Sequence, residues 1–122
     1  MADYKKLTVY QKAFKLSMEV FQVSKNFPKE ERYALIDQMR RSSRSVCANL
    51  AEAYRKRKYP AHFVSKLTDC DMENSETRVW LDFALECNYL DETLHAKLYS
   101  DTEEIGKLLF HMINYPEKYG AK

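Results

Sequence analysis

The sequence predicts an all-α protein that folds as an antiparallel up-down-up-down four-helix bundle. The 122 residues include only two glycines and three prolines. Because both residue types interrupt helices, their scarcity favours long helical segments. Apolar residues also recur at helical spacing in four segments, which short polar or proline-containing stretches separate. A chain of this length is enough for one core, so we expect a single domain over residues 1–122.

The first helix is expected over residues 8–25 and the second over residues 30–56. Thr8 followed by Gln11 is typical of a capping box, and Pro28 ends the first helix because proline lacks a backbone donor. The apolar stripe of the first helix comprises Val9, Ala13, Leu16, Val20 and Val23. The stripe of the second helix comprises Leu35, Met39, Val46, Leu50 and Ala53, flanked by Ile36, Ser43 and Tyr54.

The third helix is expected over residues 60–86 and the fourth over residues 92–113. Pro60 suits the first position of a helix, and Asp91 suits the N-cap position. The stripe of the third helix comprises Phe63, Leu67, Cys70, Asn74, Thr77, Leu81 and Leu85. The fourth helix carries Leu94, Leu98, Ile105, Leu108, Leu109 and Met112. Four amphipathic helices joined by short connections are typical of an up-down bundle.

The third helix carries more apolar residues than one stripe requires, because Val79, Trp80 and Phe83 lie away from that stripe. One interpretation is a wide core contact with two neighbouring helices. The other is a subunit interface, where aromatic residues concentrate. Burial of one such side chain contributes about 1.5–3 kcal/mol. We therefore expect a homo-oligomer whose interface includes these three residues together with Glu73 and Glu76.

Positive charge concentrates in the second helix. Residues 38–58 hold seven basic side chains and one acid, whereas the third helix is acidic between residues 69 and 86. Antiparallel pairing of the two helices would place Arg44 near Glu76, Arg41 near Arg78 and Cys47 near Cys70. One interpretation is a salt-bridged face, in which exposed ion pairs contribute about 0–1 kcal/mol each. The other is a phosphate-binding stripe that follows a nucleic-acid backbone.

The sequence contains no pattern that predicts an enzyme, a metal site or a cofactor site. A di-iron bundle needs two Glu-x-x-His pairs, and only residues 92–95 match this spacing. The three cysteines form no CxxC pair, and there is no Gly-rich phosphate loop. No apolar run approaches the roughly 20 residues that span a membrane, and the N-terminus lacks the apolar region of a signal peptide. We therefore expect a cytoplasmic, non-enzymatic protein without a membrane partner.

Four segments of the chain carry motifs that matter together, through their order and spacing. The central segment is Gln38-Met-Arg-Arg-Ser, continued by Ser45-Val-x-x-Asn49-Leu-Ala-Glu52-Ala. The three further segments are Leu7-x-Val-Tyr-Gln-Lys-Ala13, Asn26-Phe-Pro28-x-x-Glu31-x-Tyr33, and Ser75-Glu-Thr-x-Val-Trp-Leu-Asp-Phe-Ala84 with Tyr89-Leu90. Together these segments resemble the 23S rRNA intervening-sequence protein family, the bacterial "four helix bundle proteins", and the resemblance spans nearly the whole chain.

This resemblance implies an antiparallel four-helix bundle that assembles as a pentamer. Some family members are encoded inside intervening sequences of large-subunit ribosomal RNA genes. A related group serves as accessory variability determinants of diversity-generating retroelements, where a basic pentamer engages nucleic acid and a reverse transcriptase. The family pattern usually has glycine at the position of Ala53, so the second helix should continue unbroken here. Met72 and Glu73 replace a common Gly-Ser, which adds an acid.

Two functional hypotheses follow from these observations. The first is a non-enzymatic oligomeric accessory protein that binds the backbone of RNA or DNA, alone or beside a reverse transcriptase or another protein partner. Its phosphate contacts would come from Arg40, Arg41, Arg44, Arg55, Lys56, Arg57 and Lys58. The second is a protein–protein scaffold without nucleic-acid binding, in which the same arginines pair with Glu73 and Glu76 of a neighbouring subunit. Of the first set, residues 55–58 are expected to be the better phosphate contacts, because they lie away from most of the acids.

Overall fold

Four long helices make up most of the computed structural model, which describes residues 3–121. Within those residues there is no strand, so the all-α prediction is confirmed. The long helices are α1 (Thr8–Ser24), α2 (Leu35–Arg55), α3 (Pro60–Glu86) and α4 (Glu92–Asn114). Three 3-10 turns accompany them: η1 (Tyr4–Lys6), η2 (Lys29–Glu31) and η3 (Pro116–Tyr119).

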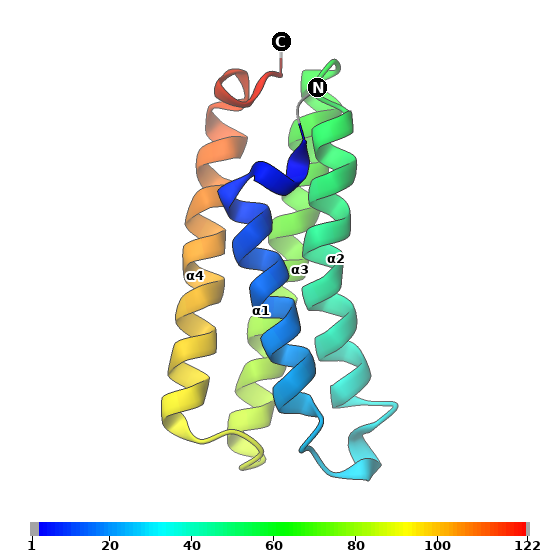
Figure 1. Ribbon diagram of the computed structural model, residues 1–122, viewed down its shortest axis with the longest axis vertical. Coiled ribbons are helices and arrows are strands. Elements are labelled where there is room, and N and C mark those ends of the chain that lie inside the picture. Colours follow the sequence, from blue (N-terminus) through cyan, green and yellow to red (C-terminus); the bar gives the residue numbers. More distant parts are fainter. Residues whose placement is uncertain (1–2, 122) are drawn as a thin grey trace.

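Successive helices run in opposite directions, as the colours of Figure 1 show. The contacts agree with this direction: along each pair of neighbouring helices, the contacting residue on one helix rises in number as its partner on the other falls. Between α1 and α2, for example, the hydroxyls of Ser17 and Ser43 are 3.3 Å apart, and Arg40 Nε donates to Ser24 Oγ over 2.9 Å. The same order holds for Ser42–Thr77 and Glu52–Lys66 between α2 and α3, Asn74–Thr102 and Asp82–His95 between α3 and α4, and Lys12–Glu104 and Glu19–Lys97 between α1 and α4.

The core follows the predicted stripes, although Val23, Leu94 and Leu108 are only partly buried at its edge and the stripe of α3 differs at one position. The buried residues of this helix are Phe63, Leu67, Cys70, Asn74, Thr77, Leu81 and Ala84. Their spacing alternates between four and three residues, which keeps a seam of 3.5 residues per turn facing its neighbours. That repeat selects Ala84 for the core, whereas the predicted Leu85 is only half-buried. On α2 the helix continues through Ala53, which is fully buried.

Some of the predicted helix ends are correct and others are wrong. Asp91 caps α4 as predicted, since its carboxylate accepts from Leu94 N over 2.7 Å. The predicted capping box is wrong, because Thr8 is already helical and the side chain of Gln11 donates to Lys5 O instead. Helix α2 begins at Leu35 and not at residue 30, since residues 29–31 form a 3-10 turn.

The α2–α3 connection lies at the same end of the bundle as both ends of the described chain (Figure 1). Arg57 joins these parts, because its Nε donates to Tyr54 O over 2.8 Å and its Nη1 donates to Tyr119 O over 3.5 Å. Gly120 has a left-handed backbone (φ 89°) and packs against the same guanidinium. The turn η3 is therefore anchored to the C-terminal end of α2.

Candidate nucleic-acid interface

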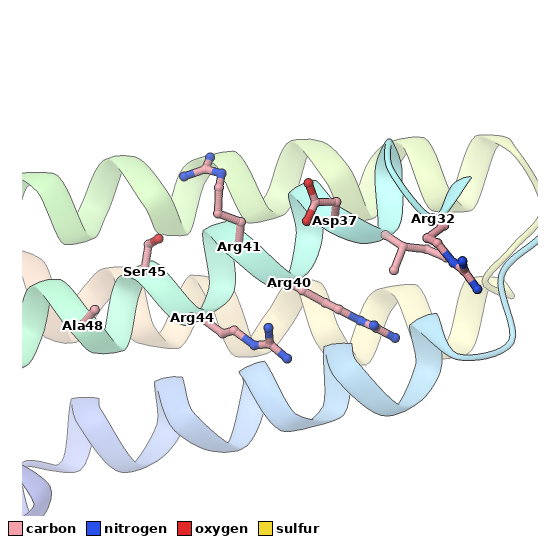
Figure 2. A pocket seen from close by; sticks show the side chains of 8 residues that line it. Arg32, Asp37, Arg40, Arg41, Arg44, Ser45 and Ala48 are labelled. Atoms are coloured by element: carbon pink, nitrogen blue, oxygen red, sulfur yellow. The ribbon is translucent and has the colours of Figure 1, made fainter. Parts of the chain in front are cut away.

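A basic cleft of about 460 Å³ lies on the outer face of α2. Its residues come from the helix itself and from the turn before it, and Figure 2 shows their side chains. Helical spacing explains the arrangement, because residues three, four, seven and eight positions apart share one side of a helix. The cleft is lined by Arg32, Ile36, Asp37, Arg40, Arg41, Arg44, Ser45 and Ala48.

Two of these arginines reach toward α1, as Figure 2 shows. Arg40 is half-buried, with its guanidinium carbon 4.7 Å from the centre of the Phe21 ring, and its Nη2 donates to Phe21 O over 3.4 Å. The guanidinium carbon of Arg44 lies 5.7 Å from the same ring, and Arg44 is exposed. Such cation–π contacts hold a charged group near an aromatic face without neutralising its charge.

The third arginine, Arg41, points toward α3 and is bound to acids there (Figure 2). Its Nη2 donates to Glu76, and its Nη1 lies 3.5 Å from Glu73 Oε2. The hydrogen bond to Glu76, supported by the charges of both carboxylates, raises the pKa of the Arg41 guanidinium. The predicted pairing of Arg44 with Glu76 is therefore wrong, because Arg41 holds Glu76 and Arg44 faces α1.

Positive charge in the cleft is only partly compensated. Within residues 3–121, Arg32, Arg40 and Arg44 have no carboxylate within 4.0 Å, whereas Arg41 has two such partners. Asp37 is the one acid that lines the cleft. The outer face of α2 therefore offers several guanidinium groups to an anion.

Arg32 is a cleft residue that the sequence analysis missed. It lies just after η2, and its guanidinium carbon is 5.8 Å from the centre of the Tyr33 ring. Basic residues were counted only over positions 38–58, so Arg32 was left out. In the structure Arg32 follows the turn at residues 29–31 and lies at the end of the cleft. The available signal was spacing, because Arg32 precedes Ile36 by four residues and Arg40 by eight.

The second predicted basic group, residues 55–58, is separate from the cleft. Ala48 and Arg55 are seven residues apart on α2, which corresponds to roughly 10 Å along the helix. Arg57 is engaged with Tyr54 and with η3, and its guanidinium carbon is 3.6 Å from the centre of the Tyr54 ring. Arg55, Lys56 and Lys58 are exposed. The seven predicted phosphate-binding residues thus divide into two sets. Three of them line the cleft, and the other four, residues 55–58, form what we call the end group.

Four of the five predicted interface residues, Glu73, Glu76, Trp80 and Phe83, lie on the side of α3 that adjoins α2. Trp80 and Phe83, whose ring centres are 6.0 Å apart, line an apolar groove of about 300 Å³ together with residues of the α2 start. Phe83 is 54% exposed and Val79 is exposed as well. Trp80 Nε1 is buried and has no acceptor among residues 3–121. Glu73 and Glu76 lie on the same side, but they bind Arg41 of their own chain.

Three residues of the types used in catalysis or metal binding, His95, Cys47 and Cys70, lie in structural environments. Within residues 3–121 no three His, Cys, Asp or Glu side chains are grouped so as to hold a metal ion. The Nε2 atom of His95 lies 2.9 Å from Asp82 Oδ1. Burial raises the pKa of Cys47 to about 11 and that of Cys70 further, so both thiols stay protonated near neutral pH. In the same part of the chain, no helix combines the length and apolar character needed to span a bilayer.

Comparison with known proteins gives a match to one family and matches to several solved structures. The profile of a protein family described as "23S rRNA-intervening sequence protein" matches residues 5–111. A crystal structure from Bacteroides thetaiotaomicron VPI-5482, described as a protein with unknown function from the S23 ribosomal protein family, superposes with a TM-score of 0.79. The two chains are 27% identical, and the alignment covers 87% of this chain and 95% of the other. Among curated proteins, none matches this chain.

Proposed function

Because this chain belongs to the 23S rRNA-intervening sequence protein family, we propose that it is a non-enzymatic accessory protein that binds the phosphate backbone of RNA or DNA. The observation that carries this proposal is the cleft on α2, where Arg32, Arg40 and Arg44 lack carboxylate partners within residues 3–121. Guanidinium groups suit this role, because their planar fork of donors matches the oxygens of a phosphate.

The surroundings of the cleft favour one path for a bound strand. On the α3 side, Asp69, Glu73 and Glu76 line a hollow of about 250 Å³, and their charges repel phosphate. On the α1 side the neighbouring cation is Lys25, whose Nζ lies 4.6 Å from the centre of the Phe21 ring. A backbone bound at Arg40 and Arg44 would therefore run on the side of α2 that faces α1.

The end group supplies a second, weaker contact in this proposal. Arg55, Lys56 and Lys58 are exposed and close to the C-terminus of α2, where the helix dipole also attracts cations. Arg57, like Arg40, has only part of its guanidinium free, because its Nε and Nη1 donate to backbone carbonyls. The cleft, and not this end group, is the primary site that we propose.

The test is a salt titration of oligonucleotide binding followed by fluorescence anisotropy. We expect measurable binding at low salt, with log K falling by roughly 0.7–0.9 per phosphate contact for each unit of log salt. Arg44→Glu should weaken binding by about tenfold or more and flatten this slope. Lys107→Glu, which makes the same charge change at an exposed site on α4, serves as the matched control. Absence of binding to both RNA and DNA at low salt would falsify the proposal.

A second candidate function is assembly, favoured by the groove at Trp80 and Phe83. The groove is lined mainly by apolar side chains, among them the exposed ring of Phe83, and such a surface is unfavourable in water. We propose that a second copy of the chain covers this groove, which accords with the pentamer that the resemblance implies. Assembly and nucleic-acid binding use different sides of α2, so the two functions are compatible.

A further inference from the structure

An aromatic row runs along the side of α1 that adjoins the basic cleft. The ring centres of Tyr4 and Tyr10 are 5.0 Å apart, and those of Tyr10 and Phe14 are 6.1 Å apart. Phe14, Met18 and Phe21 continue the row at spacings of three or four residues, which place them on one side of the helix. We call these four aromatic rings and the one methionine among them the aromatic row: Tyr4, Tyr10, Phe14, Met18 and Phe21.

Phe21 connects the aromatic row to the cleft. The cations of Lys25, Arg40 and Arg44 lie 4.6, 4.7 and 5.7 Å from the centre of its ring. The hydroxyl contact between Ser17 and Ser43 further shows that the middle of α1 lies against the middle of α2. Figure 2 shows Arg40 and Arg44 extending from α2 toward α1. Planar apolar groups and unneutralised guanidinium groups therefore share one surface.

Packing within the fold does not explain the outer part of the aromatic row. Phe14 is 51% exposed and Met18 is 45% exposed, whereas the core residues of α1 are buried at Val9, Ala13 and Leu16. Exposed apolar groups side by side on a folded protein mark a contact surface. The cations beside them indicate the charge of the partner.

We propose that this α1–α2 surface binds single-stranded nucleic acid, with phosphates on Arg40 and Arg44 and bases stacked on Phe14 and Tyr10. The inference rests on the proposed function and adds the class of nucleic acid. A duplex turns its base faces inward and offers a helix surface only its backbone and grooves. A single strand exposes its base faces, and proteins that bind it combine a basic groove with aromatic rings. Bases can therefore stack on the aromatic row when the ligand is a single strand, and not when it is an intact duplex.

The experiment compares a single-stranded RNA or DNA oligonucleotide with a duplex of the same length and sequence, at one salt concentration. We expect the wild-type protein to bind the single strand roughly tenfold more tightly, since one stacked base changes affinity by about that factor or more. Phe14→Ala should remove this preference while leaving duplex affinity unchanged. Phe14→Trp, which keeps an aromatic face, should retain the preference.

Phe110→Ala is the matched control, because Phe110 is 70% exposed on α4, which contributes no residue to the cleft. Equal binding of both ligands by the wild type, or equal effects of Phe14→Ala and Phe110→Ala, would overturn the single-strand assignment and leave backbone binding standing. Binding of neither ligand would overturn both proposals. If Phe14→Ala reduces the mass of an oligomer without altering ligand preference, the aromatic row is a subunit contact and the assignment is wrong.

Discussion

Gly106 on α4 is a small residue whose missing side chain leaves room for a charged one. A Cβ atom at this position would lie 2.8 Å from Arg78 Nη2. Arg78 is held there by two hydrogen bonds, from Nε to Thr102 Oγ1 over 2.9 Å and from Nη2 to Thr102 O over 3.0 Å. Asn74 Nδ2 donates to the same carbonyl over 2.8 Å. The glycine therefore allows α3 and α4 to be joined by a polar cluster inside the bundle.

We expect Gly106→Ala to lower the free energy of unfolding by about 1 kcal/mol. Alanine gains about 1 kcal/mol in helix propensity over glycine, but a lost hydrogen bond from a charged donor costs about 1.5–3 kcal/mol. In an Arg78→Ala background, the same substitution should instead stabilise the protein by up to about 1 kcal/mol, since the guanidinium is gone. Urea unfolding of the four variants measures both effects. Stabilisation in both backgrounds would show that Arg78 moves aside freely.

Sequence reasoning at this scale identified the buried residues better than the partners of charged ones. Arg78 was expected level with Arg41 on the acidic helix, yet its side chain turns toward α4. Arg44 was expected at Glu76, yet it faces Phe21. An apolar stripe reveals which side of a helix is buried. It does not reveal how the helix is rotated about its axis against two neighbours at once, and a rotation of one residue position changes which arginine meets which acid.

At the scale of elements, the start of α2 depends on a contact that is remote in sequence. Glu31 Oε2 accepts a hydrogen bond from Tyr89 Oη over 2.9 Å, and Glu31 Oε1 accepts from Leu35 N over 3.4 Å. The rings of Phe27 and Tyr89 are also 5.2 Å apart. The α3–α4 connection thereby holds the turn before α2, and with it Arg32, at the end of the cleft.

This contact predicts a pH dependence. The hydrogen bond to Glu31, together with burial, raises the pKa of Tyr89 to about 12, above its ordinary value of about 10. A raised pKa means that the bond contributes fully to stability below pH 10, and that its contribution is lost as pH rises toward 12. The difference in Tm between wild type and Tyr89→Phe should thus be constant from pH 7 to 9 and shrink above pH 10. In a Glu31→Gln background this pH dependence should be reduced, and a constant difference up to pH 12 in the wild-type background would contradict the assignment.

The same contact explains why helix ends were predicted unevenly. The bounds of α3 were correct because Pro60 starts the helix locally and the apolar repeat continues to its end. The start of α2 was wrong because Glu30 and Glu31 suit the first turn of a helix, and only a tyrosine 58 residues away gives Glu31 another role. A helix boundary can be predicted from nearby residues only where those residues, and not a distant contact, determine it.

At the scale of the whole molecule, charge is segregated although the net charge is only +2. The α1–α2 side carries arginines and aromatic rings, whereas Asp69, Glu73 and Glu76 make the α3 side acidic. Ion pairs join α1 to α4 at Lys12–Glu104 and Lys97–Glu19. The sequence predicted the contrast between basic and acidic helices, and the antiparallel order of the helices followed from their short connections. The stripe of arginines that lines the cleft could be predicted from helical spacing, whereas the side of α2 on which each arginine finds its partner could not.

The groove at Trp80 leads to a prediction about assembly. We expect light scattering to give a mass several times the 14.5 kDa of one chain. Phe83→Glu should reduce that mass, because a carboxylate buried in an apolar interface is strongly unfavourable. Phe110→Glu, at an exposed phenylalanine on α4, should leave it unchanged. A wild-type mass of one chain, or equal effects of the two substitutions, would contradict assembly through this groove.

Both ends of the described chain lie at one end of the bundle, which is also the end of the α2–α3 connection (Figure 1). The cleft extends along α2 from Arg32 to Ala48, toward the opposite end. A domain fused at either terminus would therefore leave the cleft uncovered. The fold is thus suited to being tethered at one end while its basic face stays free.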